Sequence, residues 1–247
     1  MMQNCDGDLP LHVAVDSRAF NAAKALLKVY PQASVLKNQA GNSPLSLLCK
    51  NYSMSDFNVE WLDLFLSTNP VSIGVRDQKG NLPSDILRNA ASKAHVNSLR
   101  YIYMLHNAIE KRVSKHTVKL LLQAFSTSCF AQDNEGRVPL HYACSNFTFE
   151  YLENLLLLLD FDPDSLSIED NQGKTPLQYL SADALVRLEN DIFLVHHLAA
   201  HSLKISGESL RLLFHYFPKS ISTPDKRGML PFHYAVLNSA STVEVLM

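Results

Sequence analysis

Three neighbouring histidines, His196, His197 and His201, are the residues whose types and spacing come nearest to a chemical site in this sequence. His197 and His201 are four residues apart, so they would share one helix face and could reach a single Zn²⁺ ion. Asp191 precedes them, but the sequence has no HExxH pattern and no third ligand at a fixed spacing. We interpret the three histidines as partly buried or surface residues of a helix, with a metal-dependent enzyme as a remote alternative.

The rest of the sequence contains no recognisable catalytic motif. It has no GxSxG nucleophile motif, no phosphate-binding P-loop and no GxGxxG nucleotide motif. The four cysteines form no CxxC pair and share no common spacing, which argues against a zinc site or a disulfide framework. We therefore predict a non-enzymatic protein with no catalytic residues, cofactor or metal, in a reducing compartment, either the cytoplasm or the nucleus.

Composition and charge indicate a folded and nearly neutral chain. Of its 247 residues, 47% are hydrophobic and 19% are charged, and the net charge is -2. These values argue against disorder. Because lysine and arginine do not outnumber the acidic residues, nucleic acid is not expected as a primary partner. The sequence has neither a secretory signal nor an apolar run of the roughly 18 residues that a membrane span needs. We expect no membrane insertion.

Glycine and proline fall at regular positions that define an internal repeat. The pattern Asx-x-x-Gly-x-x-Pro occurs six times and contains six of the eight glycines. The repeat glycines are Gly7, Gly41, Gly80, Gly136, Gly173 and Gly228. An Asx side chain can close a turn on its own backbone, glycine accepts a positive φ, and proline suits the first residue of a helix. The pattern predicts a tight turn that leads into a helix, six times.

A second set of prolines lies ten residues before the repeat glycine, at Pro31, Pro70, Pro163 and Pro218. An apolar pair such as Phe65–Leu66 precedes each of them. Because proline cannot continue a helix, this set marks the end of a second, amphipathic helix. Each unit should therefore read as turn, helix, connection, helix and loop.

The segments LPLHVA (9–14), VPLHYA (138–143) and LPFHYA (230–235) resemble the TPLHxAA signature of ankyrin repeats, whereas the other three copies are degenerate. This resemblance implies an all-α fold, an ankyrin-like helical solenoid of about six units. We expect a single domain over residues 1–247, with units that start near residues 4, 38, 77, 133, 170 and 225. The last unit is expected to be incomplete.

The third and fifth units are each longer than the others by about 20 residues. The extra segments, around 92–111 and 184–203, have apolar residues at steps of three and four, which predicts inserted helices. An offset of 92 residues also aligns SKHTVKLLLQAF with SGESLRLLFHYF. We therefore predict that a short unit and a long unit form a duplicated pair.

The resemblance also assigns structural roles to individual residues. It implies that His12, His141 and His233 brace consecutive turns by hydrogen bonding to loop backbone. Leu9, Leu82, Val138 and Leu230 stand where the family has a capping threonine, so we expect several looser turns. Tyr142, Tyr179 and Tyr234 recur at one position of the first helix, which we interpret mainly as packing.

For function, the resemblance implies a protein-protein interaction scaffold or adaptor that binds a partner protein through its hairpin tips and concave inner-helix face. An open alternative is a regulatory or targeting module of a larger protein whose catalytic or channel part is absent. We expect a monomer or part of a longer array. The candidate contact residues are Asp6, Asp8, Gln39, Asn42, Gln78, Lys79, Asn134, Glu135, Arg137, Asn171, Gln172, Lys174, Lys226, Arg227 and Met229.

Overall fold

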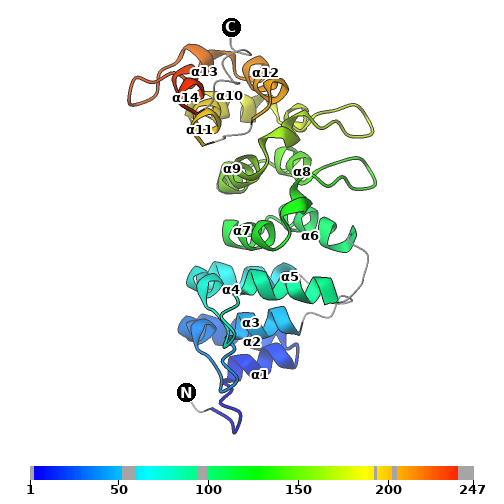
Figure 1. Ribbon diagram of the computed structural model, residues 1–247, viewed down its shortest axis with the longest axis vertical. Coiled ribbons are helices and arrows are strands. Elements are labelled where there is room, and N and C mark those ends of the chain that lie inside the picture. The colour runs from blue at the N-terminus through cyan, green and yellow to red at the C-terminus, as the bar shows by residue number, and fades with distance from the viewer. Residues whose placement is uncertain (1–2, 52–58, 94–98, 192–193, 202–204, 239–247) are drawn as a thin grey trace. The chain divides into compact units, whose positions relative to one another are not determined.

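The computed structural model describes residues 3–51, 59–93, 99–191, 194–201 and 205–238 (Figure 1). Every regular element in these ranges is a helix, which confirms the predicted all-α class for the described residues. The chain divides into two compact units, an N-terminal unit (Met1–Ser128) and a C-terminal unit (Cys129–Met247). Within each unit, the helices stack side by side in the manner of a helical solenoid.

The N-terminal unit consists of helix pairs that pack in chain order. Its elements are α1 (Pro10–Asp16), α2 (Phe20–Val29), η1 (Pro31–Val35), α3 (Pro44–Lys50), α4 (Val59–Thr68), η2 (Pro70–Gly74), α5 (Pro83–Lys93), α6 (Leu99–Glu110) and α7 (Lys115–Ala124). The inner helices α1, α3 and α5 pack one on the next, and α2, α4 and α7 form a second column. The short helix η3 (Ser126–Cys129) follows α7 in the chain.

The C-terminal unit begins with the same arrangement and then departs from it. Its elements are α8 (Pro139–Ser145), η4 (Phe149–Tyr151), α9 (Leu152–Phe161), η5 (Pro163–Ser167), η6 (Pro176–Tyr179), α10 (Ala182–Asp191), α11 (Leu194–His201), α12 (Gly207–Tyr216), α13 (Pro218–Ser222) and α14 (Pro231–Asn238). α8 packs against η6 and α9, and α12 packs against η5. The inner helix α14 packs against α11.

The predicted inserted helices are present in both long units. α6 lies in the segment 92–111, α10 begins two residues before the segment 184–203, and α11 lies within it. Residues 94–98, 192–193 and 202–203 of these segments are outside the described ranges. α7 and α12 begin and end 92 residues apart, as the duplicated pair requires. The fifth unit differs in its inner helix, which shrinks to the single turn η6 because Leu180 is extended and Ser181 caps the new helix α10.

The apolar pairs that precede the second set of prolines form the centre of the packing. Phe65 and Leu66 are fully buried, and Leu159 is as well. Burying a side chain of this size stabilises the fold by about 2 kcal/mol. Beside them on α4, the Trp61 ring meets Phe20 of α2 edge to face, with ring centroids 5.1 Å apart.

The loops predicted after those prolines are in fact short helices. η1, η2, η5 and α13 each begin with the proline, because its fixed φ suits a first helical residue and its missing N–H costs nothing there. Buried serines two residues later secure three of these turns. Ser72 donates to the Asn69 carbonyl at 2.8 Å, and Ser165 and Ser220 donate to the equivalent carbonyls of Asp162 and Phe217 at 2.7 and 2.6 Å.

Cys49, Cys129 and Cys144 are buried and Cys5 is exposed, and no disulfide joins them within the described residues. Burial raises the pKa of the Cys49 and Cys144 thiols, and it raises that of Cys129 to about 12. Cys49 and Cys144, which lie on inner helices, therefore act as packing residues. Among the described helices, none combines the length and the apolar character that crossing a bilayer would require.

Candidate interaction surface

The six turns share one hydrogen-bond pattern, which confirms the turn predicted from the Asx and glycine positions. The Asp170 Oδ1 atom accepts from the amides of Gln172 and Lys174 at 2.8 and 3.0 Å, and four other Asx residues accept two turn amides in the same way, while Asn38 accepts the Asn42 amide at 3.0 Å. All six repeat glycines have φ between 71° and 84°. The turn backbone is therefore fixed from within.

The first-helix histidines join successive turns. His12 accepts from the Leu9 amide through Nδ1 at 3.2 Å, so Nε2 carries the proton and donates to the Asn42 carbonyl at 3.0 Å. His141 makes the equivalent bonds to Val138 and Lys174, at 3.1 and 3.0 Å. These contacts confirm the brace for both residues. Burial lowers the pKa of both imidazoles, which favours the neutral form that this pattern requires.

His12, His141 and His233 supply helix capping at positions where the sequence predicts a weak cap. The Leu9, Val138 and Leu230 side chains cannot accept a hydrogen bond, but each of their amides donates to the histidine three residues later. The Leu82 amide donates to Asp85 in the same way, at 3.0 Å. Thus the cap is supplied by the third helical residue instead of the residue before the helix.

Three turns of the C-terminal unit carry an aspartate–tyrosine hydrogen bond that was not predicted from the sequence. Tyr142, Tyr179 and Tyr234 donate to the Oδ2 atoms of Asp133, Asp170 and Asp225, at 2.7, 2.5 and 2.6 Å. In the sequence, a tyrosine nine residues after each of these aspartates could have indicated this hydrogen bond. The Tyr179 hydrogen bond is the main cause that lowers the pKa of Asp170 to about 2.

Arg137 joins two of these tyrosines into a cluster at the fifth turn. Its guanidinium lies 5.1 Å from the centre of the Tyr179 ring and 5.8 Å from that of Tyr142. It also pairs with Glu135 at 2.8 Å, with Asp170 at 3.6 Å and with the Tyr179 hydroxyl at 3.2 Å. We call Glu135, Arg137, Asp170 and Tyr179 the fifth-turn cluster.

The predicted contact residues differ in exposure. Asp6, Gln39, Gln78, Lys79, Asn134, Glu135, Asn171, Gln172, Lys174, Lys226 and Arg227 are exposed, whereas Asp8, Arg137 and Met229 are half-buried. Asn42 is only 8% exposed, because its carbonyl accepts from His12 and its side chain accepts from Lys50. Backbone bonds also join neighbouring tips, from Gln39 to Asp6 at 3.2 Å and from Asn171 to Glu135 at 2.9 Å.

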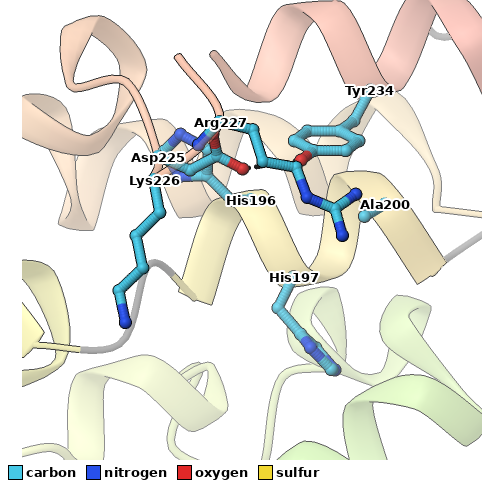
Figure 2. A pocket seen from close by; sticks show the side chains of 7 residues that line it. All are labelled: His196, His197, Ala200, Asp225, Lys226, Arg227 and Tyr234. Atoms are coloured by element: carbon cyan, nitrogen blue, oxygen red, sulfur yellow. Dashed lines mark hydrogen bonds between the residues drawn. The ribbon is translucent and has the colours of Figure 1, made fainter. Parts of the chain in front are cut away.

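His196 and His197 border an open pocket of about 280 Å³ in the C-terminal unit (Figure 2). Its lining residues are His196, His197 and Ala200 of α11, Asp225, Lys226 and Arg227 of the sixth turn, and Tyr234 of α14. Burial lowers the pKa of His196, while Asp225 and the Thr223 and Met229 backbone act in the opposite direction. His197 Nε2 lies 2.7 Å from Asp160 Oδ1 of α9.

These contacts give no support to the metal-dependent enzyme. His197 is already engaged by Asp160, and the side chain of His201 lies outside the described residues. Within the part of the chain that the structure describes, no group of three or more histidines, cysteines or acidic residues is placed to hold a metal ion.

The comparisons with known proteins agree with the repeat geometry. Residues 105–195 match the family model for ankyrin repeats, in three copies. This part of the chain consists of ankyrin repeats. Ankyrin repeats form a protein-protein interaction module, generally without enzymatic activity. The matching region runs from α6 to the start of α11, so it includes the fifth-turn cluster and ends just before the two histidines of the pocket.

Solved structures of other ankyrin repeat proteins are similar to this chain. The crystal structure of EF0377, an ankyrin repeat protein, is 23% identical and covers 69% of this chain and 89% of its own, with a TM-score of 0.33. The ankyrin repeat domain of Bcl-3, described as a unique member of the IkappaB protein family, is 18% identical and covers 98% and 99%, with a TM-score of 0.30. Among curated protein sequences, no match is found.

Proposed function

We propose that this chain is a scaffold or adaptor that binds a partner protein through its turn tips and the face formed by its inner helices. The observation that carries this proposal is the contrast between fixed backbone and exposed side chains in the turns. Asx hydrogen bonds and bonds between neighbouring tips hold the backbone, while Gln78, Gln172 and Arg227 at the tips are exposed. A pre-organised loop loses little conformational entropy on binding, so its contacts contribute more fully to affinity.

The inner-helix face offers different chemistry in the two units. In the N-terminal unit it presents aliphatic groups, with Val13 48% exposed and Leu47 half-buried. In the C-terminal unit it presents half-buried tyrosines together with Arg137 and Lys174. Tyrosine and arginine are enriched at the energetic centres of protein interfaces, which favours the C-terminal unit as the stronger contact region.

We propose that the protein acts in the cytoplasm or the nucleus. We also propose that it is a monomer or part of a longer repeat array. Cys49 and Cys144 are thiols buried inside helices, and such reduced cysteines are typical of proteins that work in a reducing compartment.

A differential capture experiment tests the proposal. The purified chain is immobilised and exposed to a cell lysate. The proteins that it retains are quantified by mass spectrometry for the wild type and for matched charge variants. Lys226→Glu/Arg227→Glu and Gln78→Glu/Lys79→Glu alter exposed tips, whereas Lys24→Glu/Lys28→Glu alters exposed residues of α2. We expect at least one tip variant to lose most of a partner that the α2 variant retains, with unchanged circular dichroism. Equal capture by every variant would contradict the proposal.

A further inference from the structure

The pocket beside the sixth turn is lined by the side chain of Arg227. Figure 2 shows the Arg227 side chain extending from the turn past Tyr234 towards Ala200. Its backbone amide bonds to Asp225, but its guanidinium makes no hydrogen bond or ion pair with any residue that the structure describes. Lys226 lines the same pocket and is exposed. We call this site the sixth-turn pocket.

The fifth-turn cluster shows how the same chain satisfies a comparable arginine. There the pair formed by Tyr179 and Asp170 lies beside Arg137, and a second carboxylate, that of Glu135, meets the guanidinium at 2.8 Å. The Glu135 side chain is 63% exposed, so this carboxylate reaches the arginine from the solvent side. A complete site of this type has a tyrosine, an aspartate that accepts from it, an arginine and a second, exposed carboxylate.

The sixth-turn pocket has three of these four components. Tyr234 and Asp225 form the pair, and Arg227 is the arginine. Asp225 is the counterpart of Asp170 and not of Glu135, because its Oδ1 atom accepts two turn amides and its Oδ2 atom accepts the Tyr234 hydroxyl. No other carboxylate is among the described residues that line the pocket. Lys226 and Arg227 together outweigh the charge of Asp225.

We propose that the sixth-turn pocket binds a carboxylate side chain, a glutamate or aspartate in an acidic segment of the partner protein. Arg227 would donate paired hydrogen bonds to this carboxylate, the arrangement in which a guanidinium binds a carboxylate most strongly. Lys226 adds positive charge at the rim, and Tyr234 and Ala200 form the walls around the aliphatic part of the incoming side chain. This inference rests on the proposed function, because it names the chemistry by which one predicted tip recognises its partner.

A peptide-binding measurement with the full chain tests the inference. The probe is a fluorescein-labelled peptide of alternating glutamate and glycine with blocked ends, followed by fluorescence anisotropy at low salt. We expect Lys226→Gln/Arg227→Gln to weaken binding about tenfold, which corresponds to one charge-assisted contact. Lys24→Gln/Lys28→Gln removes the same charge from α2 and should weaken binding less than about twofold, since only long-range attraction is lost.

Three results would overturn the inference: no binding of the glutamate peptide, an equal loss for both double variants, or equal binding of a glutamine–glycine peptide. Circular dichroism of both variants verifies that they fold. The outcome is separate from that of the capture experiment. If tip variants lose the partner but the peptide results are negative, only the carboxylate inference fails. If the peptide binds as expected but no tip variant alters partner capture, the proposed function fails.

Discussion

The N-terminal and C-terminal units close the same turn with different side chains. In the N-terminal unit, Asn4 and Asn38 bond the turn, and the residues nine positions later are the aliphatic Val13 and Leu47. In the C-terminal unit all three turns use an aspartate, and the residue nine positions later is a tyrosine that donates to it. The backbone geometry is the same in both units, since all six glycines have a similar positive φ.

The difference follows from the second polar atom of the Asx side chain. Oδ1 accepts the turn amides in either residue, but the remaining atom is a donor in asparagine and an acceptor in aspartate. The Asn38 amide group accordingly donates to Asp8 at 2.7 Å, whereas the aspartates need a donor such as the tyrosine hydroxyl. Asp77 fits this account, because Lys50 reaches its Oδ2 atom at 3.2 Å and the later residue remains an isoleucine.

The largest expected effect concerns the geometry that the two units share. An alanine Cβ at Gly136 would lie 2.8 Å from the Asn171 backbone nitrogen, and one at Gly41 would lie 2.7 Å from the Gln78 Cβ. Left-handed strain and overpacking together should destabilise Gly136→Ala and Gly41→Ala by about 3 kcal/mol each. Urea denaturation followed by circular dichroism measures this loss.

Gly173→Ala is the matched control, because its φ is also positive but a Cβ there would meet nothing within 4 Å. Only the backbone strain remains, so we expect a cost of about 1 kcal/mol. If all three variants lose the same free energy of unfolding, the contacts of Gly41 with Gln78 and of Gly136 with Asn171 add nothing to the cost of backbone strain. Close contact between neighbouring turns would then not be a feature that the two units share.

The next effect separates the two turn chemistries. Asp133→Ala leaves two turn amides and the Tyr142 hydroxyl without their acceptor and should cost about 2–3 kcal/mol. Asn38→Ala removes one turn acceptor and the contact with Asp8 and should cost about 1 kcal/mol. Urea denaturation again measures both losses. A larger loss for Asn38→Ala would reverse the comparison.

The smallest effect is a difference in acid sensitivity. The folded pKa of Asp170 and that of Asp77 are lowered to about 2, so the stability that each contributes is full above the unfolded pKa of about 4. This stability is lost as the pH falls from about 4 towards 2. Protection against hydrogen exchange should therefore fall between pH 4 and pH 2 at the amides of Lys174 and Asn81, while the Asn42 amide in its asparagine turn should change less.

Asp77 makes this measurement decisive because it belongs to the N-terminal unit. If acid sensitivity follows the unit and not the Asx residue, the Asn81 amide will behave like that of Asn42, and the chemical account is wrong. The histidines provide a common baseline. The pKa of both His12 and His141 is lowered by burial, so both units lose this contribution together as the pH falls below about 6.5.

Most of the fold could be predicted because glycine and proline act locally. Gly136 and Pro139 restrict backbone angles at fixed positions, and the three-residue spacing between them reports a turn and a helix start. The histidine braces followed from the family resemblance. The shortening of the fifth inner helix to η6 could not be predicted, because Leu180 has no local feature that breaks a helix.

The candidate site was less predictable, because its contacts join residues far apart in the chain. The Arg137 guanidinium meets Tyr179, which is 42 residues away, and repeat spacing alone does not give the side-chain direction that brings them together. Exposure also depends on packing. Asn42 occupies the same turn position as Lys174, yet it is buried, whereas Lys174 is exposed.

The edge-to-face contact between Trp61 and Phe20 makes the two units optically distinguishable. Trp61 is the single tryptophan of the chain and lies in the N-terminal unit. The fluorescence of Trp61 under selective excitation will therefore report on the N-terminal unit, while far-ultraviolet circular dichroism reports on the helices of both units. Denaturation curves from the two signals will coincide if the units unfold as one cooperative body, and they will separate if each unit has its own midpoint.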